Sequence, residues 1–372
     1  MKAQTIKYLW VVLAVAMISE NRYVVGQDEL RHDYFVYVTC ESADEVDVVR
    51  FDGVRAVVVH RIPVGFRSTE IEGPHGITLS PDGKYWFLTM AHGIPFGQVY
   101  KFSTENNRRL GQVELGLFPA TMQISVATGL LHVVNFNLHG DREPSSVSIV
   151  DPVEMAEVAR IQTGVMPHGS RFSPDGRHHY SAAMMSDTLY EMDALDFEVK
   201  RTLKISPKHH HTAHDKLPKG HHKHMAMPTW VQIHPALPRA YVALNGSDEV
   251  VEVDLEEWKV RRRFATSEGP YNVEITPEGT RMVVTYKKSG STGVWDLATG
   301  TELVRISHSR QVPHGIAITP DSRYAFVTVE GKGSQPGAVE LLDLVHLKRI
   351  TLVDVAQQAS GIAFWKMQLT DR

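Results

Sequence analysis

The chain has 372 residues, of which 42% are hydrophobic and 22% charged, a composition that supports a sizeable core and excludes disordered or collagen-like chains. Its formal net charge is −4 at pH 7, which argues against a nucleic-acid partner, because such proteins carry clustered Lys and Arg. The single cysteine, Cys40, excludes an intramolecular disulfide, so imidazole would have to supply most ligands of any bound metal.

The first 26 residues have the layout of a secretory signal. Lys2 and Lys7 flank the start of an apolar run at residues 8–18, and small residues follow at 24–26. The run is short for a bilayer span, and no later stretch reaches eighteen consecutive apolar residues. We therefore expect an exported protein, periplasmic or extracellular, with no stable membrane span. An uncleaved signal that anchors the chain is the alternative.

One sequence pattern recurs along the rest of the chain. It reads GPHGITLSPDGKYWFLT at residues 73–89 and returns at 166–182, 269–285 and 312–328, with weaker copies at 118–134 and 227–243 and a half copy at 359–365. Each copy predicts a short apolar strand, a turn of the Pro-Asp-Gly type and a second strand, and two further strands follow before the next copy. Four strands in a unit of this length are typical of a propeller blade.

Seven copies predict an all-β fold, a seven-bladed β-propeller of four-stranded antiparallel blades. Counted from the residue after each repeat proline or its equivalent, the copies begin at His75, Thr121, His168, Thr229, Tyr271, His314 and Ser360. The last copy is incomplete, so N-terminal strands such as residues 33–40 must complete its blade, which also removes a free sheet edge. We expect one propeller domain over residues 33–367, with an insertion at 206–228 between the fourth and fifth blades.

Several of these segments carry a family resemblance. VYVTC at 36–40, SPDGKYWFLT and TPDSRYAFVT resemble the YVTN-type β-propeller repeat over nearly the whole chain after the signal. This resemblance implies the fold and leaves the function open. The PHG segments also resemble histidine-bearing segments of the nitrous-oxide reductase propeller, where such histidines bind a copper cluster. The chain lacks the paired cysteines of that enzyme's cupredoxin-like domain, so the activity is not carried over.

Histidine occupies three of the seven copy starts. The first strand of a propeller blade lines the central channel, so His75, His168 and His314 are expected to encircle the channel mouth. Neutral imidazole is a common ligand of first-row metals, and three histidines with one open position suit a catalytic site. Loops that open on the same face add His92 and His139 as candidate ligands.

The insertion carries seven further histidines, which we call the histidine tract. They are His209, His210, His211, His214, His221, His222 and His224. As the only large insertion in the array, on the predicted mouth face, the tract is expected to recruit metal or to cap the site, although its composition alone is a weak indication of metal binding. Met184, Met185 and Cys40 in mouth-face loops favour copper, while zinc, nickel and iron stay open.

The leading prediction is thus an exported propeller that binds a transition metal, most readily copper, at the mouth of its channel, for metal handling or for redox chemistry on an unidentified small molecule. The main alternative is a non-catalytic scaffold or assembly factor of the cell envelope, which presents the mouth face to a protein partner. A lactonase-like hydrolase has less support, because no acid and base pair can be assigned. Whether the protein is an enzyme stays open.

Overall fold

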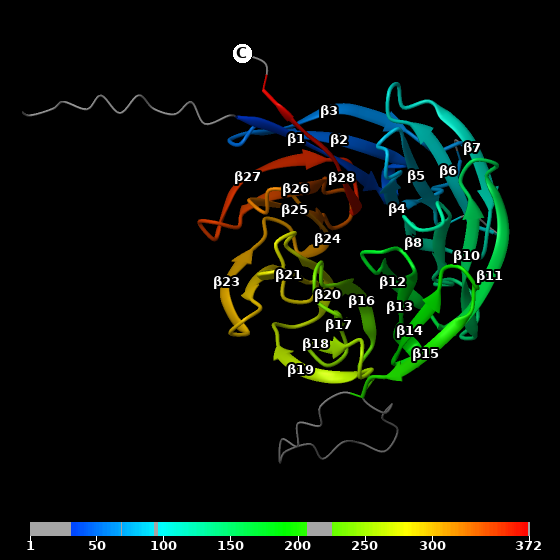
Figure 1. The fold of residues 1–372 in the computed structure, drawn as a ribbon. Helices are drawn as coiled ribbons and strands as arrows, with labels where there is room; N and C mark the ends of the chain where they lie inside the picture. The colour runs from blue at the N-terminus through cyan, green and yellow to red at the C-terminus, as the bar shows by residue number, and fades with distance from the viewer. Residues whose placement is uncertain (1–30, 68, 93–95, 207–224, 371–372) are drawn as a thin grey trace, which may run out of the picture.

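Seven sheets of four antiparallel strands form a closed ring in the part of the chain that the structure describes (Figure 1). The structure is a computed structural model and describes residues 31–67, 69–92, 96–206 and 225–370. The predicted seven-bladed all-β propeller is confirmed. The predicted signal and the histidine tract lie outside the described residues, and within them no helix is long and apolar enough to cross a bilayer.

In every blade one strand lines the channel and the other three follow it outward. Blade 1 consists of β28 (Ala359–Leu369), β1 (His32–Cys40), β2 (Glu45–Phe51) and β3 (Ala56–Pro63). Blade 2 consists of β4 (Pro74–Leu79), β5 (Tyr85–Met90), β6 (Gln98–Ser103) and β7 (Arg109–Glu114). Blade 3 consists of β8 (Pro119–Ile124), β9 (Leu131–Asn135), β10 (Pro144–Asp151) and β11 (Ala156–Val165). Blade 4 consists of β12 (Pro167–Phe172), β13 (His178–Ala183), β14 (Thr188–Asp193) and β15 (Val199–Lys204).

The remaining three blades follow the same order. Blade 5 consists of β16 (Pro228–Ile233), β17 (Arg239–Leu244), β18 (Glu249–Asp254) and β19 (Lys259–Ala265). Blade 6 consists of β20 (Pro270–Ile275), β21 (Arg281–Tyr286), β22 (Ser291–Asp296) and β23 (Thr301–Ser307). Blade 7 consists of β24 (Val312–Ile318), β25 (Tyr324–Glu330), β26 (Gly337–Asp343) and β27 (Lys348–Val355). Two short 3-10 helices, η1 (Glu41–Ala43) and η2 (Met184–Ser186), lie in loops.

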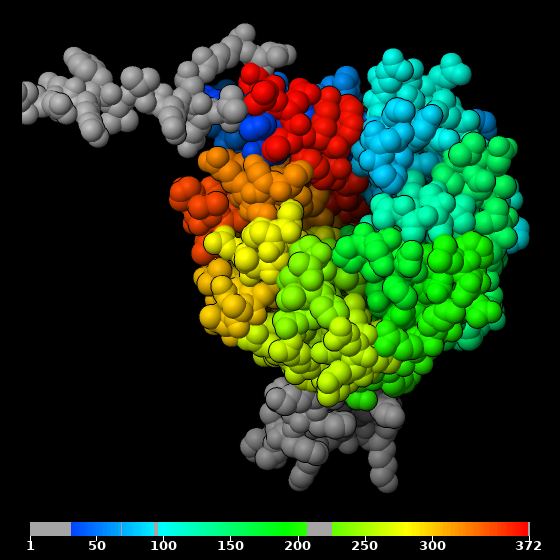
Figure 2. All heavy atoms as spheres, viewed as in Figure 1, coloured from blue at the N-terminus to red at the C-terminus, as the bar shows by residue number. Residues whose placement is uncertain are grey.

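The two ends of the described chain close the ring together. Strand β1 pairs antiparallel with β28, with Val38 opposite Ile362, and Figure 1 shows the red C-terminal strand beside the blue N-terminal one. The shared blade predicted from the half copy is therefore present. Figure 2 shows the blades packed side by side round the ring, in the order of the chain.

The Ser-Pro-Asp-Gly turns form for a local reason. In blade 2 the Ser80 hydroxyl donates to the carboxylate of Asp82 at 2.6 Å, and the same carboxylate accepts the backbone N–H of Lys84 at 3.1 Å. Gly83 follows at φ +69°, in the left-handed region that glycine adopts without strain. Where they occur, these turns join the channel strand to the second strand of the blade and so set where the channel strand ends.

Apolar and aromatic side chains fill the space between most neighbouring blades. Between blades 1 and 2, the ring of Tyr37 stacks on Trp86 and Trp86 stacks on Phe102, with ring centroids 5.2 and 3.9 Å apart. Such pairs contribute beyond the area that they bury.

The interface between blades 3 and 4 departs from this pattern, because it holds a pair of fully buried histidines. The rings of His132 and His179 lie 4.9 Å apart and pack against Phe172, and none of their four ring nitrogens has a hydrogen-bond partner among the described residues. Burial lowers the pKa of His132 to about 3 and holds that of His179 well below the ordinary value. Both imidazoles are therefore neutral near pH 7.

The sequence prediction is wrong by one residue in blade 3. Strand β8 begins at Pro119, so Ala120 and not Thr121 occupies the position that His75 has in blade 2. The pairing of Met122 with Val133 matches that of Ser170 with Ser181. The error arises because this copy lacks the PHG and SPDG signatures that fix the register elsewhere.

Candidate functional site at the channel mouth

The residues that follow the first proline of each channel strand, or Ala359 in the case of β28, form one ring at the mouth of the channel, which we call the mouth ring. Its members are His75, Ala120, His168, Thr229, Tyr271, His314 and Ser360. The imidazole of His75 lies 5.9 Å from that of His168 and 5.5 Å from that of His314, measured between ring centroids. The structure thus brings together the three histidines that the repeat count selected, and all three are buried.

Tyr271 completes the aromatic part of the mouth ring. Its ring lies 5.3 Å from that of His168 and 4.8 Å from that of His314. Nδ1 of His168 faces the carbonyl oxygen of Thr229 at 3.2 Å and must donate to it, which leaves the Nε2 lone pair to accept the Tyr271 hydroxyl at 2.9 Å. Burial, with the charge of Glu330 next, keeps the pKa of Tyr271 well above its ordinary value, so the phenol is the donor.

Two of the ring imidazoles are held neutral. Burial, followed by the nearby charge of His75, lowers the pKa of His168 to about 3. Burial and the charge of Lys287 hold the pKa of His314 well below its ordinary value. An unprotonated imidazole keeps a lone pair that a metal or a proton donor can use.

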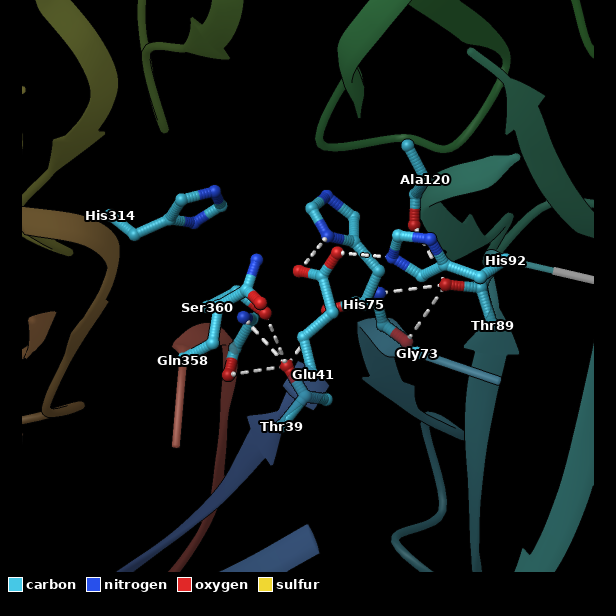
Figure 3. A network of polar contacts seen from close by, with 12 residues as sticks. Thr39, Glu41, Gly73, His75, Thr89, His92, Ala120, His314, Gln358 and Ser360 are labelled. Carbon is cyan, nitrogen blue, oxygen red and sulfur yellow. Dashed lines mark hydrogen bonds and ion pairs between the residues drawn. The ribbon is translucent and has the colours of Figure 1, made fainter. Parts of the chain in front are cut away.

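A buried carboxylate supports the third imidazole. Glu41, at the start of η1 in the loop after β1, accepts a hydrogen bond from Nδ1 of His75 at 3.0 Å and from Nε2 of His92 at 2.8 Å (Figure 3). Burial alone would raise the pKa of the Glu41 carboxyl, but the charge and hydrogen bonds of His75 and His92 outweigh it and hold the pKa well below the ordinary value. The anionic carboxylate thus fixes the His75 ring with Nε2 away from Glu41.

A second charged pair stands on the other side of the mouth. Nζ of Lys287 lies 3.3 Å from Oε1 of Glu330 and 4.0 Å from the centre of the Tyr271 ring. The same Glu330 oxygen lies 3.9 Å from Nε2 of His314. Burial lowers the pKa of Lys287, and the carboxylate of Glu330 opposes this shift.

The candidate ligands from the loops lie outside the mouth ring. His92 is engaged with Glu41, and its ring packs beside those of His139 and Phe118, with centroids 5.3 and 5.2 Å away. Phe118 also contacts His75, at 5.3 Å. His92 and His139 thus form a pair next to the ring, with Phe118 in contact with both and with His75.

The sulfur atoms that favoured copper in the sequence analysis lie outside the mouth ring. Cys40 is fully buried in the apolar cluster between blades 1 and 7, and burial, with the charge of Asp47 next, keeps its thiol pKa well above the ordinary value. A thiolate there is therefore disfavoured. Met184 packs against the cluster of Phe118 and Phe136 beside the mouth.

Sequence reasoning missed Glu41, Lys287 and the chemical part played by Tyr271. Glu41 directly follows Cys40, which was recognised as a loop position, but the N-terminal strands lack the repeat signature that would have fixed which side chain turns toward the axis. Tyr271 was placed at a copy start, and only the structure shows that its hydroxyl reaches His168. Lys287 follows the second strand of blade 6, in the class of loop that supplied His92 in blade 2.

No preformed metal site is visible in the described ranges. Within them, no group of three or more histidine, cysteine, aspartate or glutamate side chains is placed to hold a metal ion as it stands. The Nε2 lone pair of His168 accepts the Tyr271 hydroxyl, so a three-imidazole site requires that hydroxyl to move. The ligand predictions for His75, His168, His314, His92 and His139 stay predictions.

Comparison with known proteins identifies the fold class of the chain and assigns no function. No protein-family model and no curated relative matches the chain. Among solved structures, the chain is similar to Kuenenia stuttgartiensis hydrazine synthase, with 21% identity, a TM-score of 0.59 and coverage of 75% of this chain and 80% of that one. It is also similar to a functionally unknown protein from Desulfotomaculum acetoxidans DSM 771, with 12% identity, a TM-score of 0.69 and coverage of 89% and 98%. At these identities the likeness shows the fold, a seven-bladed β-propeller.

Proposed function

We propose that this propeller is exported and that its mouth ring binds one transition-metal ion through His75, His168 and His314. The observation that carries the proposal is the convergence of three imidazoles from three different blades, with centroid separations of 5.5 and 5.9 Å from His75. Metal–nitrogen bonds of 2.0 to 2.1 Å and tetrahedral angles place such centroids about 5 Å apart. Copper is the first metal to test, because it binds nitrogen sites most strongly among divalent first-row metals.

The protonation states support this proposal. A metal binds only the unprotonated imidazole, so each histidine that is neutral in the free protein spares the metal a competition with protons. His168 and His314 have lowered pKa values because they are buried. Two of the three proposed ligands are therefore ready to bind at neutral and mildly acidic pH.

Glu41 is proposed to orient His75 for the metal. A ligand histidine usually donates its second ring N–H to a carboxylate, which fixes the tautomer and raises the basicity of the other nitrogen. The bond of 3.0 Å between His75 Nδ1 and Glu41 has this arrangement. Glu41→Gln is expected to weaken copper binding about 10- to 100-fold, measured by competition with a calibrated chelator. Glu157→Gln, at an outer strand, is the control, and an affinity equal to wild type in Glu41→Gln would contradict this role.

Tyr271 is expected to oppose metal binding, because its hydroxyl uses the lone pair of His168. Tyr271→Phe removes this competitor and leaves the ring in place, so copper affinity should rise roughly three- to tenfold, the worth of one hydrogen bond. The same chelator competition measures it. A fall in affinity would show that the phenol is itself a ligand, and no change would show that His168 does not bind the metal.

The direct test separates the mouth ring from the histidine tract. In a variant with the seven tract histidines replaced by serine, which we call the tract variant, elemental analysis after copper loading and desalting should give one equivalent per chain. His168→Ala in the tract variant should lose that equivalent, whereas His60→Ala, at an exposed position of β3, should keep it. A tract variant that holds no metal would overturn the proposal.

A protein-binding face is the second candidate function, and one observation favours it. Large apolar side chains stand exposed in the mouth-face loops of blades 2 and 3 and in the loop that leads into blade 2: Phe66 (73% exposed), Ile71 (56%), Phe96 (53%) and Leu138 (41%). Exposed apolar groups gathered on one face often mark an interaction site. Under this reading the histidines serve as hydrogen-bonded structure around the mouth.

A further inference from the structure

The channel contains a small cavity directly below the mouth ring, lined by both apolar and polar groups. It has a volume of about 50 Å³, and its lining includes His75, His314, Thr121, Arg171, Trp230 and Asn272. One buried water needs about 10 to 15 Å³ of such volume, so the cavity has room for about three waters or one molecule of about three non-hydrogen atoms.

Glycine in the channel strands limits which side chains reach the cavity. A Cβ atom at Gly76 would lie 1.8 Å from the carbonyl oxygen of Ala120, and one at Gly361 would lie 2.0 Å from that of His75. Neighbouring channel strands therefore approach too closely for side chains at these positions. In three other channel strands, the residue equivalent to Gly76 is Thr121, Trp230 or Asn272. The side chains of these three residues therefore line the cavity just below the mouth ring.

Two of the residues that line the cavity each carry a polar atom without a hydrogen-bond partner among the described residues. The indole Nε1 of Trp230 is a donor, the Oδ1 of Asn272 is an acceptor, and the two residues are 8% and 2% exposed. A buried polar group without a partner costs about 1 to 3 kcal/mol, and native proteins satisfy nearly all such groups. A molecule in this cavity with both an acceptor and a donor would satisfy both atoms.

The charges around the cavity indicate that this molecule is neutral. Arg171 pairs with Glu274 of blade 6, places its guanidinium 4.9 Å from the centre of the Trp230 ring and donates to the carbonyl of Ser170. Its charge is therefore compensated. His75 already donates Nδ1–H to Glu41, and Nε2 of His314 lies 3.9 Å from the carboxylate of Glu330. Among the described residues, no uncompensated cation lines the cavity to hold an anion.

We propose that this cavity is a binding site for one small neutral molecule that accepts a hydrogen bond from Trp230 Nε1–H and donates one to Asn272 Oδ1. Water has this chemistry, and so have small amides and other neutral compounds of about three non-hydrogen atoms; the proposal is that the site takes such a solute in place of water. It does not rest on metal binding, so it is tested on the metal-free protein. A solute bound there lies against His75 and His314, below the proposed metal position.

Formamide is the probe, because its carbonyl oxygen accepts, its amide group donates, and it has three non-hydrogen atoms. In protein labelled with ¹⁵N at the tryptophan indoles, the resonance of Trp230 is identified by its loss in Trp230→Phe. Millimolar formamide, the range set by the affinity limit of so small a ligand, is expected to shift this resonance saturably. Trp258, whose indole N–H also has no partner among the described residues but does not line the cavity, is the internal control.

Two comparisons make the test specific. N,N-dimethylformamide has no N–H donor and two more carbon atoms, so it should give no saturable shift in the wild-type protein, a result that needs no folded variant. Asn272→Leu removes the acceptor and should weaken formamide binding at least about tenfold. If the Trp230 resonance moves no more than that of Trp258, or if both probes move it alike, the cavity serves water only and the proposal fails. This outcome would leave the metal proposal untouched.

Discussion

Acidifying the protein from pH 7 to pH 5 is expected to lower its free energy of unfolding by about 6 kcal/mol. Four buried histidines cause this: burial is the leading reason that the pKa values of His132 and His168 fall to about 3 and that those of His179 and His314 lie well below the ordinary value. In the unfolded chain each has a pKa near 6.5, so their contribution is complete above about pH 6.5 and is lost as the pH falls toward the folded values.

The size of this change in the free energy of unfolding follows from the number of protons that the unfolded and folded states bind. Below pH 6.5 each such histidine lowers the free energy of unfolding by about 1.4 kcal/mol for each unit that the pH falls, because the unfolded state binds a proton that the folded state does not. Asp47 acts in the opposite direction, since burial raises its pKa to about 6, and its protonation in the folded state offsets about 1 kcal/mol over this range. Glu41 has a lowered pKa and loses its contribution only below about pH 4.

The pair between blades 3 and 4 gives the sharpest form of this prediction. The double change His132→Phe and His179→Phe removes four buried nitrogens that have no partner among the described residues and keeps two planar rings. We expect stability at pH 7 to be equal or higher, and the dependence on pH between 6 and 5 to fall by roughly 60%, because two of the four histidines are removed while Asp47 still acts in the opposite direction. Urea unfolding at pH 7, 6 and 5 measures both effects. An unchanged pH dependence in the double variant would contradict the assignment of acid sensitivity to these buried imidazoles.

The second large effect concerns the mouth ring itself. In the tract variant, His75→Ala and His168→Ala should each weaken copper binding at least about a hundredfold, more than the loss of the supporting Glu41, because a direct ligand is removed. Chelator competition gives the affinities. His168→Gln, which keeps a hydrogen-bonding side chain, should bind as weakly as His168→Ala, and His60→Ala should bind as the parent does. Near-equal affinity in all of these chains would mean that the metal is bound elsewhere.

The repeat made the fold and the three ring histidines predictable. Each strong copy places a proline at or next to the start of a channel strand and a turn of the Pro-Asp-Gly type after its end, so the position of His168 between Pro167 and Gly169 could be counted from the sequence. Where the signature is weak, the count fails: Thr121 was placed one residue away from the position that Ala120 occupies. The repeat therefore places a side chain correctly only where a turn motif fixes the register of its strand.

The partners of the ring depended on contacts between blades, which no single copy contains. Glu41 comes from blade 1 and reaches His75 of blade 2, and Tyr271 of blade 6 reaches His168 of blade 4. His132 and His179 each read as an ordinary strand residue, and their meeting depends on which face of β9 lies against which face of β13. Such pairs are fixed by the packing of sheets round the ring rather than by local pattern.

The central claim is that one metal ion is bound by the three imidazoles of the mouth ring. X-ray absorption spectroscopy of the copper-loaded tract variant tests it most directly. We predict a first shell with three imidazole nitrogens at about 2.0 Å, with the imidazole count falling by one in His168→Ala. A first shell without imidazole scattering, or one that is identical in the two proteins, would contradict the account.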